Sequence, residues 1–347
     1  MRGEGKREIS GKAALRATSP PSSLVSRPSS LLFLLAIAAL GALLAALLFG
    51  SIPLSPAELW SVLSGQDQGI AGNILLELRL PRALAAFAVG GMLALAGAQM
   101  QVLLGNPLAD PYILGISGGA AIGALLAMLA GAAAFGINGG ALLGALASMV
   151  IVFGLAHGRG IWSPTRLLLT GVVVAAGWGA LISFLLVMAP QENLPGMLFW
   201  LMGDLAHAGR ALPGLLVLAF GLLITLPRAR SLNLLARGEQ QAAALGVAVR
   251  PLRLQLYLTA SLLTAVAVAI GGSIGFVGLV VPHMIRLFAG SDHRLLLPAS
   301  VLGGGTLLLA ADTLARTLLA PQQLPVGVLT AMLGVPLFLY LLQRGYR

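Results

Sequence analysis

Residues 90–120 read GGMLALAGAQMQVLLGNPLADPYILGISGGA: an apolar tract, a short polar turn and a second apolar tract that begins among glycines. Asn106, Pro107, Asp110 and Pro111 are typical of a helix stop followed by a tight turn. Apolar helices joined by such turns are typical of a helical membrane protein, because a helix satisfies its own backbone hydrogen bonds. Gly115 and the residues after it interrupt the second tract. We therefore expect backbone groups freed there to face protein or water.

Composition extends this prediction to the whole chain. The 347 residues are 58% hydrophobic and 9% charged, whereas a soluble domain has roughly 25% charged residues. Ten apolar tracts lie at about 31–50, 83–104, 112–134, 139–156, 167–189, 212–226, 254–270, 273–287, 295–311 and 326–342. Several are shorter than the roughly 20 residues of a perpendicular span, so some helices must be short, broken or extended. We predict an all-α, polytopic membrane protein with about ten transmembrane helices.

The ten predicted helices divide into two halves of five. An odd number of spans gives the two halves opposite orientations, which is the inverted repeat of many transporters. The first thirty residues are rich in Ser, Pro, Lys and Arg, a composition that favours a flexible tail. We thus predict a tail over residues 1–30 and one membrane domain over residues 31–347.

The net charge of +10 is spread over the loops and does not form a patch with interleaved aromatic residues, so we predict no nucleic-acid partner. If both termini are cytoplasmic, 17 of the 21 Lys and Arg residues lie on the cytoplasmic side, as the positive-inside rule requires. Arg79, Arg82, Arg210 and Arg316 fall on the other side.

The sequence offers little to support catalysis. The absence of cysteine excludes thiol catalysis and cysteine-bound metal. Gly11 and Lys12 are the nearest approach to a phosphate-binding loop, but residue 6 is Lys and residue 13 is Ala, so ATP hydrolysis would have to come from a partner. The four histidines show no ligand spacing. We predict no catalytic residue, no metal site and no cofactor bound by this chain.

Residues 231–250, SLNLLARGEQQAAALGVAVR, form a polar interruption between two apolar tracts. Two short amphipathic pieces meet at Gly238, with apolar residues at helical spacing, and both are too short to cross a bilayer. Arginines flank the segment. We predict two short cytoplasmic helices that form a docking surface for another subunit.

Several long motifs occur in a fixed order: RLPR at 79–82, the segment that begins at Gly90, SLNLLARGEQQAAALGV from Ser231, GSIGFVGLVVPHMIRLFAGSDHRLLLPAS from Gly272, ADTLAR at 311–316 and LPVGVLTAMLGVPLFLYLL from Leu324. Together they resemble the FecCD/BtuC-like permease subunits of ABC importers for iron–siderophore complexes, haem and cobalamin. The resemblance covers about residues 31–345. It implies the type II importer fold, a homodimer or a pair of related permeases, two cytoplasmic ATPases that use ATP and Mg, and a periplasmic substrate-binding protein.

The resemblance also assigns roles to residues. It places the ATPase-coupling helices at about 231–250, with Leu232, Leu235, Gly238, Glu239, Ala242, Leu245 and Gly246 as the coupling residues. It places Arg79, Arg82 and Arg316 where family members receive acidic residues of the binding protein, since guanidinium groups pair bidentately with carboxylates. Interfacial snorkelling, or an internal pair with Glu77 or Asp312, is the alternative.

Three further features concern the translocation path. Gln99, Met100 and Gln101 are candidate path residues, although polar side chains in an apolar helix can equally bond to a neighbouring helix. Pro282 and His283 match the family's Pro–His pair. Gln323 stands where family members commonly carry glutamate before LPVG, which removes a charge near Arg316.

The resulting hypothesis is a permease of the bacterial inner membrane that imports an iron–siderophore or a related metal chelate by alternating access, with energy from partner ATPases. An ion-gradient-driven secondary transporter is the alternative, although charges within the spans are sparse. A membrane enzyme is a third possibility and lacks the clustered carboxylates, nucleophile or metal triad that it would need.

Overall fold

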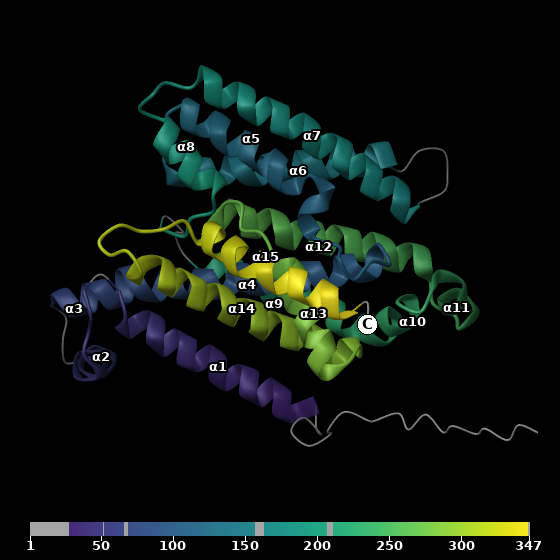
Figure 1. Cartoon of the computed structure of the whole chain (residues 1–347), viewed down its shortest axis with the longest axis horizontal. Helices are drawn as coiled ribbons and strands as arrows, with labels where there is room; N and C mark the ends of the chain where they lie inside the picture. Colours follow the sequence, from purple (N-terminus) through teal and green to yellow (C-terminus); the bar gives the residue numbers. More distant parts are fainter. Residues whose placement is uncertain (1–27, 51, 66–68, 157–162, 207–210, 346–347) are drawn as a thin grey trace, which may run out of the picture.

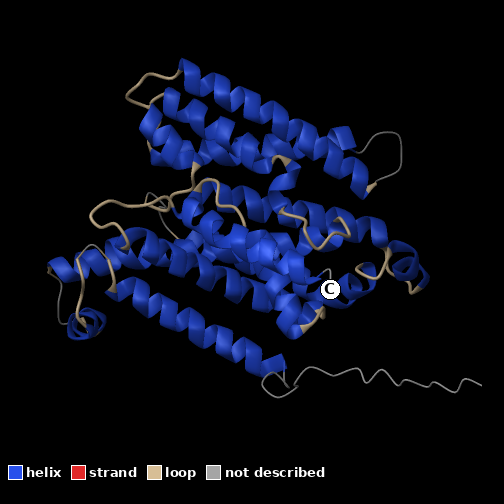
Figure 2. Ribbon diagram, in the orientation of Figure 1, coloured by secondary structure: helices blue, strands red, loops and turns tan. Residues whose placement is uncertain are grey.

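The computed structural model describes residues 28–50, 52–65, 69–156, 163–206 and 211–345. Within these residues all regular structure is helical (Figure 2), which confirms the predicted all-α class. Of the predicted tail, residues 1–27 lie outside the described part of the chain. The first helix begins at Pro28, slightly before the expected boundary.

Seven helical stretches are long and apolar enough to cross a membrane. Three shorter apolar helices lie among them, so the described residues contain ten apolar helical stretches in all. The long ones are α1 (Pro28–Leu48), α3, η1 and α4 in series (Ile70–Asn73, Ile74–Arg79 and Leu80–Leu103), α6 (Ala134–Ala156), α7 (Pro164–Met188), α9, η3 and α10 in series (Leu212–Thr225, Leu226–Arg228 and Ala229–Leu235), α12 (Val249–Gly271) and α14 (His293–Thr317). The shorter ones are α5 (Ile116–Leu129), α13 (Val277–Ala289) and α15 (Val326–Gly345).

Short helices connect the membrane helices. They are α2 (Pro56–Leu63), η2 (Pro111–Leu114), α8 (Leu194–Leu201) and α11 (Glu239–Ala244). α2 begins where Ser55 caps the backbone N–H of Glu58, and the Glu58 carboxylate in turn accepts from the backbone N–H of Ser55. This reciprocal capping satisfies two donors that a helix start otherwise leaves free.

The helices run roughly parallel and form layers (Figure 1). α5, α6 and α7 form one outer layer and pack mainly on one another, α4 lies in the middle of the molecule, and α1 and α14 pack together on the far side. α4 contacts α13 and α14, whereas α12 contacts α5 and α6. The second helix of each half thus packs on the third and fourth helices of the other half, as two related halves would.

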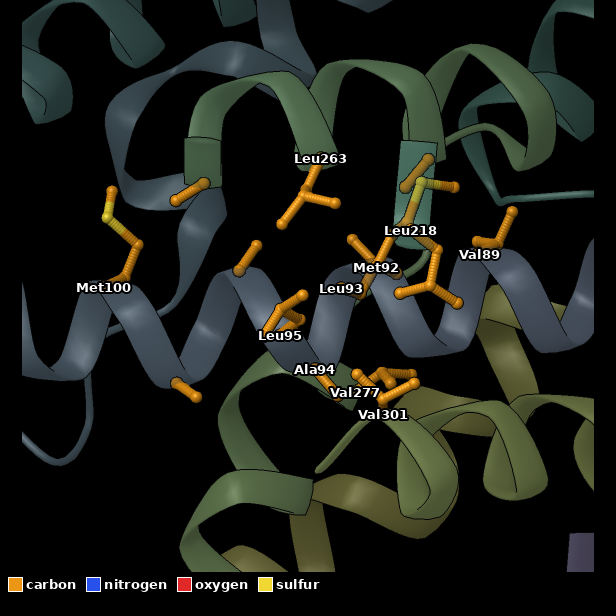
Figure 3. Packing of buried hydrophobic residues seen from close by; sticks show 14 of the residues in the cluster. Val89, Met92, Leu93, Ala94, Leu95, Met100, Leu218, Leu263, Val277 and Val301 are labelled. Carbon is orange, nitrogen blue, oxygen red and sulfur yellow. The ribbon is translucent and has the colours of Figure 1, made fainter. Parts of the chain in front are cut away.

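Glycines allow α4 to approach its neighbours at backbone distance. A β-carbon at Gly90 would overlap the carbonyl oxygen of Gly304 on α14, and one at Gly97 would overlap the carbonyl oxygen of Gly278 on α13. Small residues at such contacts let helices gain packing energy that burial of apolar surface does not supply in lipid. Figure 3 shows the surrounding core, with Leu263 of α12 on one side of α4 and Val277 and Val301 on the other.

Gly97→Ala should therefore destabilise the fold by about 1–3 kcal/mol, the usual cost of overpacking, because its methyl group must displace the α13 backbone. Gly154→Ala on α6 is the matched control, since a β-carbon there meets no atom within 4 Å. Thermal unfolding of the purified protein in one detergent compares the two. Equal stability of both variants would show that the α4–α13 contact tolerates a side chain.

Candidate functional sites at the two ends of the bundle

A buried carboxylate organises one end of the bundle. Asp312 on α14 is 0% exposed. Arg82 of α4 donates to it from Nη2 at 2.8 Å and from Nε at 3.0 and 3.1 Å, and Arg316 Nε lies 3.2 Å from its Oδ2, one turn along the same helix. Because both guanidinium groups share one carboxylate, Asp312 binds α4 to α14 at this end.

Arg79 makes a separate set of contacts. It is 5% exposed and lies at the end of the π-helical segment η1. Its guanidinium donates to the carbonyl oxygens of Leu47, Leu48 and Ile52, where α1 ends. The bond to Leu47 satisfies a carbonyl group of the last helical turn, where a helix leaves acceptors without partners. The bonds to Leu48 and Ile52 connect Arg79 to the end of α1 and to the segment that follows it.

The three arginines predicted to receive a binding protein therefore come together at one end, where Arg82 and Arg316 form the internal pair with Asp312 that was the alternative. Glu77 forms no ion pair within the described residues. Arg82 also donates from Nη1 to the amide oxygen of exposed Gln323 at 3.0 Å. The position of the missing glutamate is thus beside Arg82, and the next residue, Leu324, donates its backbone N–H to the carbonyl oxygen of Ala315, next to Arg316. A docking role stays a prediction; Arg210 lies outside the described residues.

The other end of the bundle carries the predicted two-helix loop. α10 and α11 are separated by Gly238, whose φ of +128° is a conformation that L side chains rarely adopt. Gly246 follows the end of α11 with a φ of +82°. Glu239 pairs with Arg253 of α12 at 2.9 Å. The loop is therefore a defined structure attached to α12.

Burial divides the seven predicted coupling residues into two groups. Leu232, Leu235 and Ala242 are buried, so they attach the loop to the body of the protein. Gly238, Glu239, Leu245 and Gly246 are exposed, and Leu245 is 66% exposed. Helical spacing could identify these apolar positions but could not tell which of them face the protein. Only the second group is available to a partner in this structure.

The candidate path residues are buried between helices. Gln99 donates to Thr225 Oγ1 of α9 at 2.8 Å and accepts from Thr259 Oγ1 of α12 at 2.7 Å. Met100 is fully buried in the core. Gln101 accepts from Arg286 Nη2 at 2.9 Å. In this conformation the glutamines therefore act as helix-to-helix hydrogen bonds, the second of the two roles that the sequence left open.

Gln101 and Arg286 also line a cavity of about 730 Å³ at the α11 end. Asn233, Arg237, Asp292 and Arg294 contribute to the same cavity. The Arg294 side chain donates to Asp292, which holds the pKa of that carboxyl below its usual range and keeps it ionised. A second cavity, of about 740 Å³, is lined by Trp200, Glu192, Asp204 and Gln323 among others. Gln323, which lines this second cavity, also accepts the hydrogen bond from Arg82.

A further contact at the α11 end was not predicted. Asn233 of α10 donates from Nδ2 to Asp292 Oδ1 at 2.9 Å, and its Oδ1 accepts from the backbone N–H of His293 at 2.8 Å. His293 Nδ1 lies 2.6 Å from the same oxygen. We name these three residues the α10–α14 clasp. Asn233 lies between two leucines of the quoted loop motif, and nothing in its spacing indicates a partner some sixty residues away.

No group of three or more His, Asp or Glu side chains that could hold a metal ion occurs within the described residues. His283 lies edge-on to Phe338, with ring centroids 6.2 Å apart. His157 and His207 lie outside the described part of the chain. The prediction that this chain binds no metal or cofactor stays a prediction.

The layered bundle of long apolar helices, with charged sites at its ends, is that of a multi-pass membrane protein. The chain belongs to the FecCD transport family, whose model matches residues 34–344. It is accordingly a transport permease and not an enzyme.

Proteins similar to this chain are named as transport permeases or as parts of an ABC transporter. The chain is 44% identical over 326 residues to the hemin transport system permease protein HmuU of Yersinia pestis, a match covering 90% of this chain and 94% of that protein. It is 45% identical over 277 residues to the cobalamin import system permease protein BtuC of Halobacterium salinarum, covering 78% and 73% of the two chains. A putative metal-chelate type ABC transporter solved in an inward-facing conformation matches with a TM-score of 0.78 and 35% identity, over 91% of this chain and 99% of that one.

Asp312→Asn should destabilise the protein by about 3–5 kcal/mol, because the guanidinium groups of Arg82 and Arg316 would lose the carboxylate that they share. The folded yield and the unfolding temperature in detergent measure the loss. Glu77→Gln, at an exposed position, is the control and should behave as the wild type. A fully stable Asp312→Asn protein would show that the arginines do not depend on this charge.

Proposed function

We propose that this chain is the permease subunit of an ATP-driven importer that moves a metal chelate inward by alternating access. The observation that carries the proposal is the pairing of two sites at opposite ends of one bundle: an exposed two-helix loop and a cluster of arginines around Asp312. Figure 1 shows α10 and α11, which form the loop, at the end of the bundle opposite α3. Membership of the FecCD transport family supports it. A chain driven by an ion gradient would need no exposed loop for an ATPase.

The same proposal specifies partners and orientation. A second permease subunit, two cytoplasmic ATP-binding subunits and a periplasmic substrate-binding protein would complete the transporter, with ATP and Mg used by the ATPases. The α11 end would face the cytoplasm together with both termini, as the distribution of Lys and Arg favours. The Asp312 end would face the periplasm of a bacterial inner membrane.

Haem is the first substrate to test, because the relative named as a hemin permease matches nearly the whole length of both chains. Cobalamin is the second, since relatives named as cobalamin or vitamin B12 permeases match at 45% and 39% identity. Ferric siderophores belong to the same proposed class of metal chelates. Fold alone does not choose among them, since one fold can carry different cargo.

The exposed part of the loop suits contact with an ATPase. Leu245 presents a large apolar side chain at the end of α11, and the buried residues Leu232 and Ala242 hold the loop in place behind it. An exposed apolar side chain of this size gains free energy when a partner covers it and removes it from water. Force applied to the loop would pass into α9 and α12, because α10 continues α9 through η3 and α11 contacts α12.

Reconstitution of the chain in vesicles tests the proposal directly. With the cognate ATPase and binding protein, ATP should drive uptake of one of haem, cobalamin or a ferric siderophore, and vanadate should block it. The chain alone should transport none of them. Uptake by the chain alone under an ion gradient would overturn the proposal in favour of a secondary transporter.

In the same system, Leu245→Asp should weaken association with the ATPase roughly tenfold, or about 1.4 kcal/mol, because it places a charge in an apolar contact. Its folding should be unaffected, since Leu245 is exposed. Ile70→Asp is the control: Ile70 is 80% exposed and begins α3, outside the loop. ATPase association that is equally strong in both variants would exclude Leu245 from the contact.

Gln323→Glu tests docking at the arginine cluster without breaking the internal pair. The new carboxylate would face Arg82 and compete with acidic residues of the binding protein, so the binding protein should associate more slowly. Surface plasmon resonance on nanodiscs would measure the association rate. Gln322→Glu, at the exposed neighbouring position, adds the same charge one residue away from the side chain that contacts Arg82. Equal rates for both variants would argue against docking at Arg82.

A further inference from the structure

The α10–α14 clasp lies where α10 contacts the start of α14. Asp292 is the N-cap of α14, because its side chain accepts from the backbone N–H of Arg294 at 3.0 Å. Asn233 therefore holds the cap residue and the first helical residue, His293, at the same time. α10 continues α9 through η3 as one apolar stretch from Leu212 to Leu235. A displacement of α10 must consequently displace the start of α14 or break the clasp.

α14 then connects this end to the arginine cluster. Asp312 follows His293 by nineteen positions, a distance of roughly 30 Å along a helix. Figure 1 shows α14 running along the bundle away from α10 toward the opposite end. There Asp312 binds Arg82 of α4 and lies beside Arg316. One helix thus has a specific polar attachment at each end.

Packing along α14 keeps it from moving independently of the bundle core. Gly304 meets the backbone of α4 at Gly90, and Gly305 faces the ring of Phe87. One member of the clasp is buried, since His293 is 1% exposed, whereas the side chain of Asp292 is 42% exposed. Breaking the clasp would leave the backbone N–H of the buried residue His293 without its partner, and an unpaired donor in a buried position is costly.

We infer that Asn233 is a positioning residue that couples the ATPase-contacting loop to the arginine cluster through α14. The inference rests on the proposed function and adds to it the route by which the two sites affect one another. Coupling between two sites is reciprocal. When a loaded binding protein docks at the Asp312 end, α14 would transmit the effect to the loop and raise the rate of ATP hydrolysis. In the other direction, α14 would carry motion driven by the ATPase toward the Asp312 end.

Asn233→Asp tests the inference, because it places two carboxylates about one hydrogen-bond length apart and removes the donor to Asp292. In the complete transporter in nanodiscs, stimulation of ATP hydrolysis by the loaded binding protein should fall at least fivefold, the lower range of allosteric coupling. Basal ATP hydrolysis and co-purification of the ATPase should match the wild type. Uptake should fall with the stimulation.

The exchange Asn233→Asp with Asp292→Asn should restore stimulation. It keeps one amide and one carboxylate in the clasp, and Asn caps a helix about as well as Asp. Asp292→Asn alone is the matched control and should remain coupled, because the amide oxygen of the introduced side chain could still accept from Asn233. A purely structural role for Asn233 would not predict recovery of stimulation by a second substitution.

The inference is overturned if Asn233→Asp remains fully stimulated, if it loses the ATPase from the complex, or if the exchange fails to restore stimulation. Failure of the proposed function is a separate result. In that case the wild-type chain would neither co-purify with the ATPase nor show stimulation by the binding protein, before any variant is compared.

Discussion

Close contact between helix backbones at glycines is the constraint on which this bundle depends. In lipid, apolar side chains gain little by leaving one apolar environment for another, so helices associate through tight packing and a few polar contacts. α4 meets α14 at Gly90 and Gly304, and α13 at Gly97 and Gly278. Since α4 lies at the centre of the bundle, these contacts set the positions of the helices around it and hence of the sites at both ends.

The charged side chains at the Asp312 end of the bundle have their partners within that end. Asp312 serves two arginines from two helices, and Arg79 satisfies the carbonyl groups at the end of α1. Buried ion pairs of this type add little net stability but strongly disfavour any arrangement that separates them. The arginine cluster therefore specifies how α4 and α14 align, and its limited exposure restricts what a partner could contact. Any docking protein would approach chiefly through Arg82 and the neighbouring Gln323.

The two-helix loop combines an anchored side with an exposed side. Its buried leucines belong to the core, while Leu245 and the two glycine turns lie at the surface. Burial of Leu232, Leu235 and Ala242 attaches the loop to the body of the protein, and the half-exposed pair of Glu239 with Arg253 adds a contact with α12. Under the proposed function, a loop attached in this way would transmit displacement. The clasp then ties the same loop to a second membrane helix. Motion at this end thus has two routes into the bundle, through α12 and through α14.

The ten apolar helices, the turn at residues 106–111 and the two-piece loop about Gly238 could all be predicted from the chain, because each follows from local properties: apolar periodicity, helix-stopping residues and glycine conformation. The family resemblance could likewise be seen in contiguous motifs. The partners of individual side chains could not. Arg82 and Asp312 are 230 residues apart, and Asn233 and His293 pair across two helices. Periodicity tells which residues share a helix face, but which face meets which neighbour depends on the fit of whole backbones, and that fit exists only in the folded bundle.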